Sequence, residues 1–291
     1  MAIRRRDFLA ASAAVAAVSP SVLTAGPATA AARMLKLGLV TYNWGREWDV
    51  PTVIRNCEAT GFAGVELRST HKHGVEISSD RKQRSEVRRL FEDSRVELVG
   101  LGSACEYHAV DPVVLRKNID ETKQFVRLCK DVGGTGVKVR PNGLPKERSV
   151  EQTLEQIGRS LNDVGRFAAD YDVQIRVEVH GRGTSEIRHM QTIFEIADHP
   201  NVVVCWNCNP TDLAGDGLAT NYRSLQKRMG TIHIHDLRNN KYPWEELFPL
   251  LQNTTADSFT GWALLEEGSV PQDIVPAMKE NHERWKILTS A

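Results

Sequence analysis

The sequence has no excess of charge of either sign. Its 291 residues contain 37 Lys and Arg against 37 Asp and Glu, so the formal net charge is zero. Nucleic-acid-binding proteins usually carry a basic excess, and solvating tails carry runs of acidic residues. The neutral balance therefore disfavours a nucleic-acid partner, and the remaining composition is that of an ordinary globular protein.

Cysteine is scarce and forms no dense pattern. The five cysteines stand at 57, 105, 129, 205 and 208, an odd number at wide spacings, which argues against a disulfide framework. Cys205-Trp-Asn-Cys208 has C-x-x-C spacing, but it lies in a strand-like run and no second pair completes a zinc site. We expect these thiols to pack in the core, with a redox pair as the alternative.

The start of the chain has only a short apolar run. Arg4-Arg-Arg-Asp-Phe-Leu9 precedes an Ala/Val-rich stretch over 10–18, and Ala-x-Ala triplets follow over 28–32. This order predicts a cleavable signal peptide over residues 1–32, and its paired Arg before x-Phe-Leu resembles the twin-arginine variety. A retained signal anchor is the alternative, although the run is short for a bilayer span. We expect export to the periplasm or the extracellular space, without stable membrane insertion of the mature chain.

The sequence also lacks a Gly-x-Gly-x-x-Gly motif after a strand, so nothing favours dinucleotide binding on an open sheet. Apolar strand-like segments instead recur roughly every 30 residues, the size of one βα unit. They begin near Leu35, Gly64, Val96, Gly136, Gln174, Val202, Thr231 and Gly261. Residues 33–291 contain no low-complexity linker and predict a single (β/α)8 TIM barrel. An open doubly wound sheet is the alternative.

The segments between these strands carry helix signals. Apolar residues recur with a period near 3.6 over 50–60, from Asp111 to 129 and over 149–170. A cap at Thr184 or Ser185 predicts the next helix, and residues 271–288 form the last one. The stretch that follows Asn209 is predicted to be a long loop before a short helix.

Polar side chains stand where the last four predicted strands end. In a parallel barrel these ends meet at the C-terminal mouth, where buried polar groups are costly unless they are paired or bind something. The side chains are Glu178, Asn207, His233 and Glu266. Two carboxylates, one imidazole and one amide oxygen predict a divalent metal site, with manganese as the first expectation and magnesium, cobalt or zinc as alternatives.

Such a site can polarise neighbouring carbonyl and hydroxyl oxygens of a sugar and so stabilise an enediolate. A carboxylate on each face of the carbon could then remove a proton and return it. Further polar and aromatic residues near the strand ends are predicted to bind a small sugar. They are Tyr42, Trp44, Glu66, Arg68, His108, Lys138, Arg140, His180, Asn209, His235 and Arg238. Alternatively, Arg68 and Lys138 neutralise Glu66 and Glu178 without a ligand, or Glu178 pairs with Arg176 or Arg140.

Four short motifs carry a resemblance to a known family. Glu178-Val-His180, Trp206-Asn207, His233-Ile-His-Asp236 and Leu265-Glu266 resemble the last four strand motifs of the xylose isomerase-like barrels. The resemblance implies that Glu178, Asn207, His233 and Glu266 are metal ligands and that Glu178 and Glu266 are the catalytic acid and base. Asn207 departs from the pattern, because this position is usually an aspartate. The amide removes one negative charge, so weaker metal binding is expected.

The resemblance implies a metal-assisted sugar isomerase or epimerase that abstracts a proton next to a carbonyl. Two alternatives remain open: a keto-sugar or keto-glycoside lyase or dehydratase on the same site, and a carbohydrate-binding barrel without catalysis. Apurinic endonuclease activity, which also occurs among these barrels, fits poorly with export and neutral charge. The sequence leaves the oligomeric state open and allows a homo-oligomer.

Overall fold

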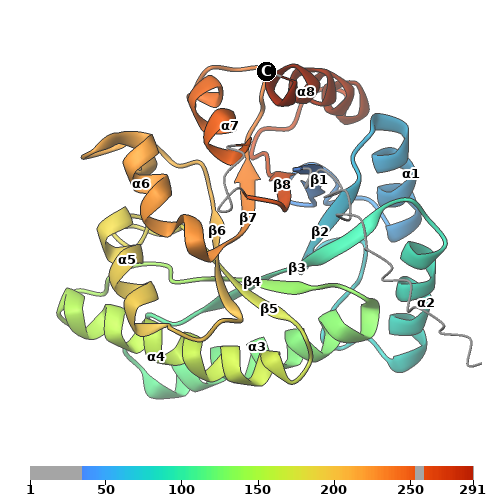
Figure 1. The fold of residues 1–291 in the computed structure, drawn as a ribbon. Coiled ribbons are helices and arrows are strands. Elements are labelled where there is room, and N and C mark those ends of the chain that lie inside the picture. Colours follow the sequence, from blue (N-terminus) through green and yellow to red (C-terminus); the bar gives the residue numbers. More distant parts are fainter. Residues whose placement is uncertain (1–34, 253–258, 291) are drawn as a thin grey trace, which may run out of the picture. The chain divides into compact units, whose positions relative to one another are not determined.

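The computed structural model describes residues 35–252 and 259–290 of the chain. Within these ranges, eight parallel strands form one closed barrel in sequence order, β1 to β8, and β8 closes onto β1. Helices surround the barrel on the outside (Figure 1). The predicted (β/α)8 barrel is confirmed. The predicted signal peptide, residues 1–32, lies outside the described residues.

Each strand begins within two residues of its predicted start. The strands are β1 (Lys36–Val40), β2 (Gly64–Arg68), β3 (Glu97–Glu106), β4 (Gly136–Arg140), β5 (Gln174–Glu178), β6 (Val202–Trp206), β7 (Met229–Ile234) and β8 (Trp262–Leu265). Their apolar residues are buried on both faces, as a parallel sheet covered by helices requires.

The predicted helices are present, and two further α-helices were not predicted from the sequence. The α-helices are α1 (Val50–Thr60), α2 (Arg81–Glu92), α3 (Pro112–Val132), α4 (Val150–Ala169), α5 (Ile187–Ile196), α6 (Gly217–Leu225), α7 (Trp244–Gln252) and α8 (Ile274–Thr289). Short 3₁₀ turns, η1 (Pro210–Leu213) and η2 (Gln226–Arg228), flank α6. The unpredicted helices are α2 and α7.

The start of α5 differs from the prediction. Its N-cap residue is Glu186, not Thr184 or Ser185. The Thr184 hydroxyl instead donates to the His180 carbonyl oxygen at 2.7 Å and accepts from the backbone N–H of Gly143 at 2.9 Å. Thr184 therefore ties the loop after β5 to the loop after β4, at the end of the barrel where the site residues lie.

The apolar core lies mainly between the strands and the helices, and the barrel interior is mostly polar. A small separate apolar cluster contains Val40, Val99 and Leu264. Below the site, the buried Arg176 guanidinium donates to the Val99 carbonyl oxygen and the Thr135 hydroxyl, each at 2.9 Å. A Cβ on Gly136 would lie 2.3 Å from Arg176 Nε, so only glycine leaves room for this side chain.

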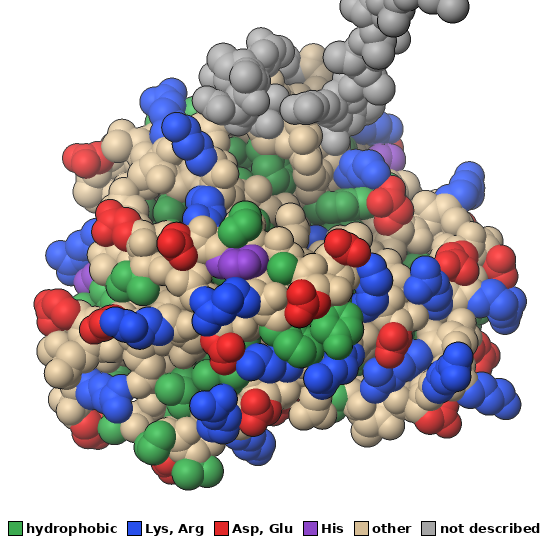
Figure 2. Space-filling view, turned by 60° about the horizontal axis from the view of Figure 1, so that its bottom comes forward, with side chains coloured by type: hydrophobic (Ala, Val, Ile, Leu, Met, Phe, Trp, Pro, Cys, Tyr) green, Lys and Arg blue, Asp and Glu red, His purple; other side chains and the backbone are tan. Residues whose placement is uncertain are grey.

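The outer surface carries both signs of charge. Figure 2 shows blue basic and red acidic side chains interspersed over one face of the molecule. All five cysteines lie in the described ranges, are buried and form no disulfide, which agrees with the prediction that they pack in the core. Among the residues that the structure describes, no helix has both the length and the apolar character needed to cross a bilayer.

Candidate active site

Three strand ends bring the predicted metal-binding side chains together. Glu178 ends β5, His233 lies in β7, and Glu266 follows β8. His233 Nδ1 is 3.3 Å from Glu266 Oε2 and 4.0 Å from Glu178 Oε1. One ligand atom from each of the three residues lies within 4.8 Å of the other two. This spacing lets one cation contact two carboxylate oxygens and one imidazole nitrogen.

Asn207, the fourth predicted ligand, follows β6 and is buried. Its Nδ2 donates to Asn209 Oδ1 at 3.4 Å, whereas its Oδ1 is buried without a hydrogen-bond partner among the described residues. An orphaned buried acceptor is costly, and an ion or a water at this oxygen would satisfy it. The donor set of Glu178, His233 and Glu266 fits a divalent cation.

Lys138 forms a buried ion pair with Glu178. Its Nζ donates to Glu178 Oε2 at 2.7 Å, and both side chains are only 3% exposed. The pair occupies one oxygen of Glu178, and the other oxygen faces His233. Lys138 thus has the neutralising contact that the alternative reading of the sequence proposed, and Glu178 still presents a free oxygen to the cluster.

The surrounding charges keep Lys138 and Glu266 ionised. Burial lowers the pKa of Lys138, but the carboxylates of Glu178, Glu266 and Glu66 outweigh it and raise the pKa above the ordinary value. Burial likewise opposes ionisation of Glu266, yet His233 and Lys138 bring the pKa of Glu266 down to about 2. Both glutamates at the cluster therefore have a charge partner.

The pKa of His233 is also shifted. Burial disfavours its charged form, but Cys205 and the carboxylates of Glu266 and Glu66 raise the pKa well above the ordinary value. In the absence of a bound cation, the ring is therefore held as an imidazolium between carboxylates. A cation at Nδ1 would replace the proton at that nitrogen.

Glu66, predicted to contact substrate, lies inside the barrel. It belongs to β2, is fully buried, and has no hydrogen-bond partner on either carboxylate oxygen among the described residues. Its Oε1 is 3.6 Å from His233 Nε2, whereas His233 Nδ1 is the ring nitrogen that faces Glu178 and Glu266. Burial raises the pKa of Glu66, but His233, Lys138 and Arg176 lower it below the ordinary value, so the carboxylate stays ionised.

Three other predicted substrate contacts join one polar network at the mouth. Arg140 Nη2 donates to Glu106 Oε1 at 2.7 Å, and His108 Nδ1 lies 3.8 Å from Glu106 Oε2. Asn142 bonds Glu106 through its Nδ2 and pairs with His180 Nδ1 through its Oδ1, the latter at 2.7 Å. Arg140 and His180 are therefore joined through Glu106 and Asn142 at the ends of β3, β4 and β5, and His108 lies beside Glu106 without a hydrogen bond from its Nδ1 to any described residue.

The two predicted aromatic contacts have different surroundings. Tyr42 is half-buried, and the Arg68 guanidinium lies 5.6 Å from the centre of its ring, within cation–π range. Trp44 is 1% exposed, packs in the main apolar core and donates to the Ser269 carbonyl oxygen at 2.6 Å. In this structure Trp44 offers no open ring face to a sugar, because its indole fastens the loop after β8 to the loop after β1.

The remaining predicted contacts hold the loops at the mouth. His235 Nδ1 pairs with the Glu266 carbonyl oxygen at 2.9 Å, and Asn209 Nδ2 donates to the Val179 carbonyl oxygen. Arg238 is paired with Asp236 and with Glu280 of α8. Glu267, which follows Glu266, accepts from the backbone N–H groups of Asp236 and Ser269 and so belongs to the loop.

The sequence reading missed a buried network behind Asn207. Tyr242 OH donates to Asp212 Oδ2 at 2.9 Å, and the backbone N–H of Asn209 donates to the same oxygen at 2.8 Å. Trp206 Nε1 in turn donates to Tyr242 OH at 3.2 Å. The signal that could have revealed it is the spacing of Asn209 and Asp212, in which the third residue of a turn bonds back to its cap.

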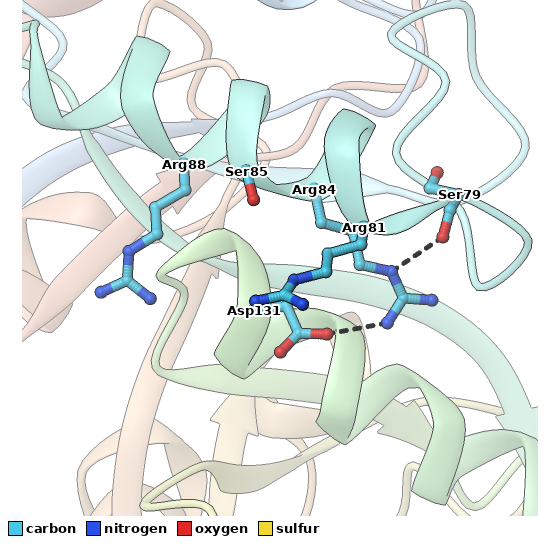
Figure 3. A pocket seen from close by; sticks show the side chains of 6 residues that line it. All are labelled: Ser79, Arg81, Arg84, Ser85, Arg88 and Asp131. Carbon is cyan, nitrogen blue, oxygen red and sulfur yellow. Dashed lines mark hydrogen bonds and ion pairs between the residues drawn. The ribbon is translucent and has the colours of Figure 1, made fainter.

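A separate cavity of about 540 Å³ lies between α2 and α3 (Figure 3). Arg84, at its wall, donates to the Ser79 carbonyl oxygen and to Asp131 Oδ2, each at 2.9 Å, and to the Ile77 carbonyl oxygen. Through these bonds the Arg84 guanidinium holds the loop before α2 against α3. None of the predicted site residues lines this cavity, so it is distinct from the barrel mouth.

Comparison with known families agrees with this geometry. The family described as "Xylose isomerase-like TIM barrel" matches residues 54–286. The chain belongs to this family, and the resemblance inferred from the four strand motifs is confirmed. A search of curated proteins found no match.

Several solved structures share the fold at low sequence identity. The 3-keto-D-glucoside 4-epimerase YcjR from E. coli is 14% identical with a TM-score of 0.73, over 89% of this chain and 100% of the other. The IOLI protein with a bound zinc atom is 15% identical with a TM-score of 0.73, over 88% and 98%. The probable 3-DHS dehydratase AsbF from Bacillus anthracis is 14% identical with a TM-score of 0.68, over 87% and 99%. At these identities the likeness establishes the fold alone.

Proposed function

We propose that the protein is a metal-assisted sugar isomerase or epimerase that abstracts a proton next to a carbonyl group. The observation that carries the proposal is the convergence of Glu178, His233 and Glu266 within 4.8 Å at the barrel mouth. The orphaned Oδ1 of Asn207 supports it, as does the similarity to a keto-glucoside epimerase and to a zinc-containing barrel.

Glu178, Asn207, His233 and Glu266 would hold the metal. When bound, a divalent cation supplies a Lewis acid that polarises the oxygens of a carbonyl and its neighbouring hydroxyl. Oxygen-rich donors with one imidazole suit manganese first, with magnesium, cobalt or zinc as alternatives. Because the amide of Asn207 is neutral, the four donors carry two negative charges.

The two glutamates are the proposed acid and base. Glu178 keeps one oxygen on Lys138 and points the other toward His233, so its position is fixed by a buried ion pair. Glu266 is held through its backbone by His235 and through its side chain by His233. One carboxylate would remove the proton from the carbon and, now a carboxylic acid, could return it to the neighbouring oxygen. For epimerisation the other carboxylate would first take up a proton from water or a sugar hydroxyl and then protonate the opposite face of the carbon.

The polar network at the mouth would orient the sugar. Arg140, His108 and His180 are gathered there by Glu106 and Asn142, and Arg68 lies over Tyr42. Such groups can hydrogen-bond several hydroxyls of one small sugar or keto-sugar and fix which C–H faces a glutamate. The proposed site residues belong to one chain, so this proposal does not require a homo-oligomer and is compatible with one.

Solvent deuterium exchange tests the proposed chemistry. The purified protein is loaded with manganese and incubated in D₂O with a panel of ketoses, keto-glycosides and sugar acids. Uptake of one deuterium at a C–H beside a carbonyl is expected, and Glu178→Gln and Glu266→Gln should each lower the rate at least about 10²-fold, the usual contribution of a positioned acid or base. Glu267→Gln, which changes the adjacent loop glutamate, is the matched control and should retain most of the rate. If no sugar of the panel exchanged, the proposal would be wrong.

A dehydratase is the second candidate, because the structurally similar AsbF is described as a dehydratase. The same carboxylate would remove the proton, and a β-substituent would then leave. The mass of the product separates the two reactions: unchanged mass indicates isomerisation or epimerisation, and loss of water or of an aglycone indicates elimination.

We also propose export through the twin-arginine route, on the basis of Arg5-Arg6-Asp-Phe-Leu9 and the small residues up to position 32. Cell fractionation of the full chain tests this. The Arg5→Lys/Arg6→Lys variant should remain in the cytoplasm, and an equal periplasmic yield of both proteins would count against the route.

A further inference from the structure

Glu66 is a buried carboxylate that substrate binding does not explain. Its exposure is 0%, and both of its oxygens lack hydrogen-bond partners among the described residues. A buried carboxylate without hydrogen bonds is costly, because its charge has left water. We therefore expect Glu66 to have a role in which it acts on a neighbouring buried side chain.

The room for Glu66 is built into the neighbouring strand. Glu66 pairs in register with Gly100 of β3, and a Cβ on Gly102 would lie 2.9 Å from Glu66 Oε1. The absence of a side chain on Gly102 leaves the carboxylate a space inside the barrel. From this space its closest ionisable neighbour is His233, at 3.6 Å between Oε1 and Nε2.

The two nitrogens of His233 face different partners. Nδ1 faces Glu178 and Glu266, whereas Nε2 faces Glu66 and has no hydrogen-bond partner among the described residues. A neutral imidazole can donate a lone pair to a metal from one nitrogen only if the other carries the proton. In metal sites a carboxylate commonly accepts that second N–H and so fixes the tautomer and the orientation of the ring.

We propose that Glu66 is a positioning residue that accepts the Nε2–H of His233 and directs Nδ1 to the metal. This inference rests on the proposed function, since it assumes a metal at the Glu178–His233–Glu266 cluster. The gap of 3.6 Å is about 0.6 Å longer than a usual N–H···O bond, so a small movement of the ring or of the carboxylate closes it. Glu66 then acts on the metal through His233 and does not touch the sugar.

Zinc affinity is the first test. Apo protein is titrated with zinc by isothermal calorimetry, for the wild type and for Glu66→Gln, which keeps the size of the side chain but removes the charge. Loss of a carboxylate partner behind a histidine ligand typically lowers metal affinity about 10- to 100-fold, and we expect that loss here. Glu106→Gln is the matched control: it removes another carboxylate near the mouth, one that is paired with Arg140, and should leave zinc affinity within about twofold.

The histidine tautomer is the second test, and it does not depend on the variant folding well. Wild-type protein labelled with ¹⁵N at histidine is loaded with zinc, which is diamagnetic, and the signals of His233 are assigned by their loss in His233→Gln. We expect a protonated Nε2 and a zinc-bound Nδ1. Because zinc on Nδ1 leaves the proton on Nε2 in any case, the readout for Glu66 is the resonance of that Nε2–H. A hydrogen bond to the Glu66 carboxylate should move it downfield and slow its exchange with water, whereas a Glu66 that serves only as a counter-ion for Lys138 and Arg176 would leave it at the shift of an unbonded N–H.

The outcomes separate the two proposals. If the wild type binds no zinc, manganese or cobalt, the proposed metal site is wrong and this inference with it. If the wild type binds zinc but Glu66→Gln binds it equally well, or if the zinc sits on Nε2, only the role of Glu66 is overturned.

Discussion

At the residue scale, the site depends on a charge balance that no single strand contains. Lys138 and Glu178 come from neighbouring strands, stand 40 residues apart in the chain and are both 3% exposed. The sequence indicated each of them as a polar strand residue. It could not decide whether Lys138 would pair with Glu178 or face a ligand, because that choice depends on side-chain positions across the barrel. Similarly, the position of Trp44 beside the first strand did not reveal that its indole turns into the core.

This pairing makes a prediction about stability. Lys138→Met removes the cation and leaves the Glu178 carboxylate buried without its partner, so the free energy of unfolding should fall by about 3–5 kcal/mol. In Lys138→Met/Glu178→Gln no unpaired charge remains, and part of that loss should be recovered. Urea unfolding of the wild type, both single variants and the double variant measures the coupling. Additive losses would show that the ion pair is not an energetic unit.

At the scale of elements, the repeating units were predictable because strand and helix leave different apolar periods in the sequence. The eight strands were found from short apolar runs, and α1, α3 and α4 from their 3.6-residue stripe. The helix α2 was missed because Phe91 is its one buried residue and most of its other positions are charged or polar. The helix α7 was missed because Pro249 lies inside it, which argues against a helix in a sequence reading.

Asp212 lies in the turn η1, which follows β6, and should make the stability of the protein depend on pH. Burial raises the pKa of Asp212 to about 7, although the donors Tyr242 and Asn209 lower it in part. The unfolded chain releases this proton near the ordinary pKa of 3.8, whereas the folded chain keeps it until about pH 7. Between these values the folded state binds the extra proton, so this contribution to stability is present at low pH and is lost as the pH rises toward about 7.

Unfolding measured from pH 4 to pH 8 checks this expectation. Asp212→Asn keeps an acceptor for Tyr242 and Asn209 but does not titrate. The difference in unfolding free energy between the wild type and Asp212→Asn should therefore change by up to about 1.4 kcal/mol per pH unit, to the disadvantage of the wild type as the pH rises. Parallel pH profiles for the two proteins would mean that Asp212 is already ionised in the folded state.

At the scale of the whole molecule, the barrel interior is unusual because many of its buried side chains are charged or polar. Ordinary barrel interiors are filled with layers of branched apolar side chains. Here Glu66, Lys138, Arg176, Glu178 and His233 are buried, and the separate apolar cluster contains only Val40, Val99 and Leu264. Glu66, Lys138, Glu178 and His233 were predicted at or near strand ends, but their mutual distances required the closed barrel.

A metal held at the Glu178–His233–Glu266 cluster would add to the stability of the entire barrel. A cation that binds only the folded state adds RT ln(1 + [metal]/Kd), about 2.7 kcal/mol at a hundred times Kd. For a chain of this length, each kcal/mol shifts Tm by about 2–4 °C, so saturating manganese should raise Tm by about 5–10 °C over the chelated protein.

Calorimetry measures this rise in Tm for the wild type and for Glu266→Gln, each with manganese and with chelator. The rise should be small or absent in Glu266→Gln, because one carboxylate ligand is lost while Lys138, Glu178 and His233 remain. An equal rise in both proteins would place the bound manganese outside the Glu178–His233–Glu266 cluster.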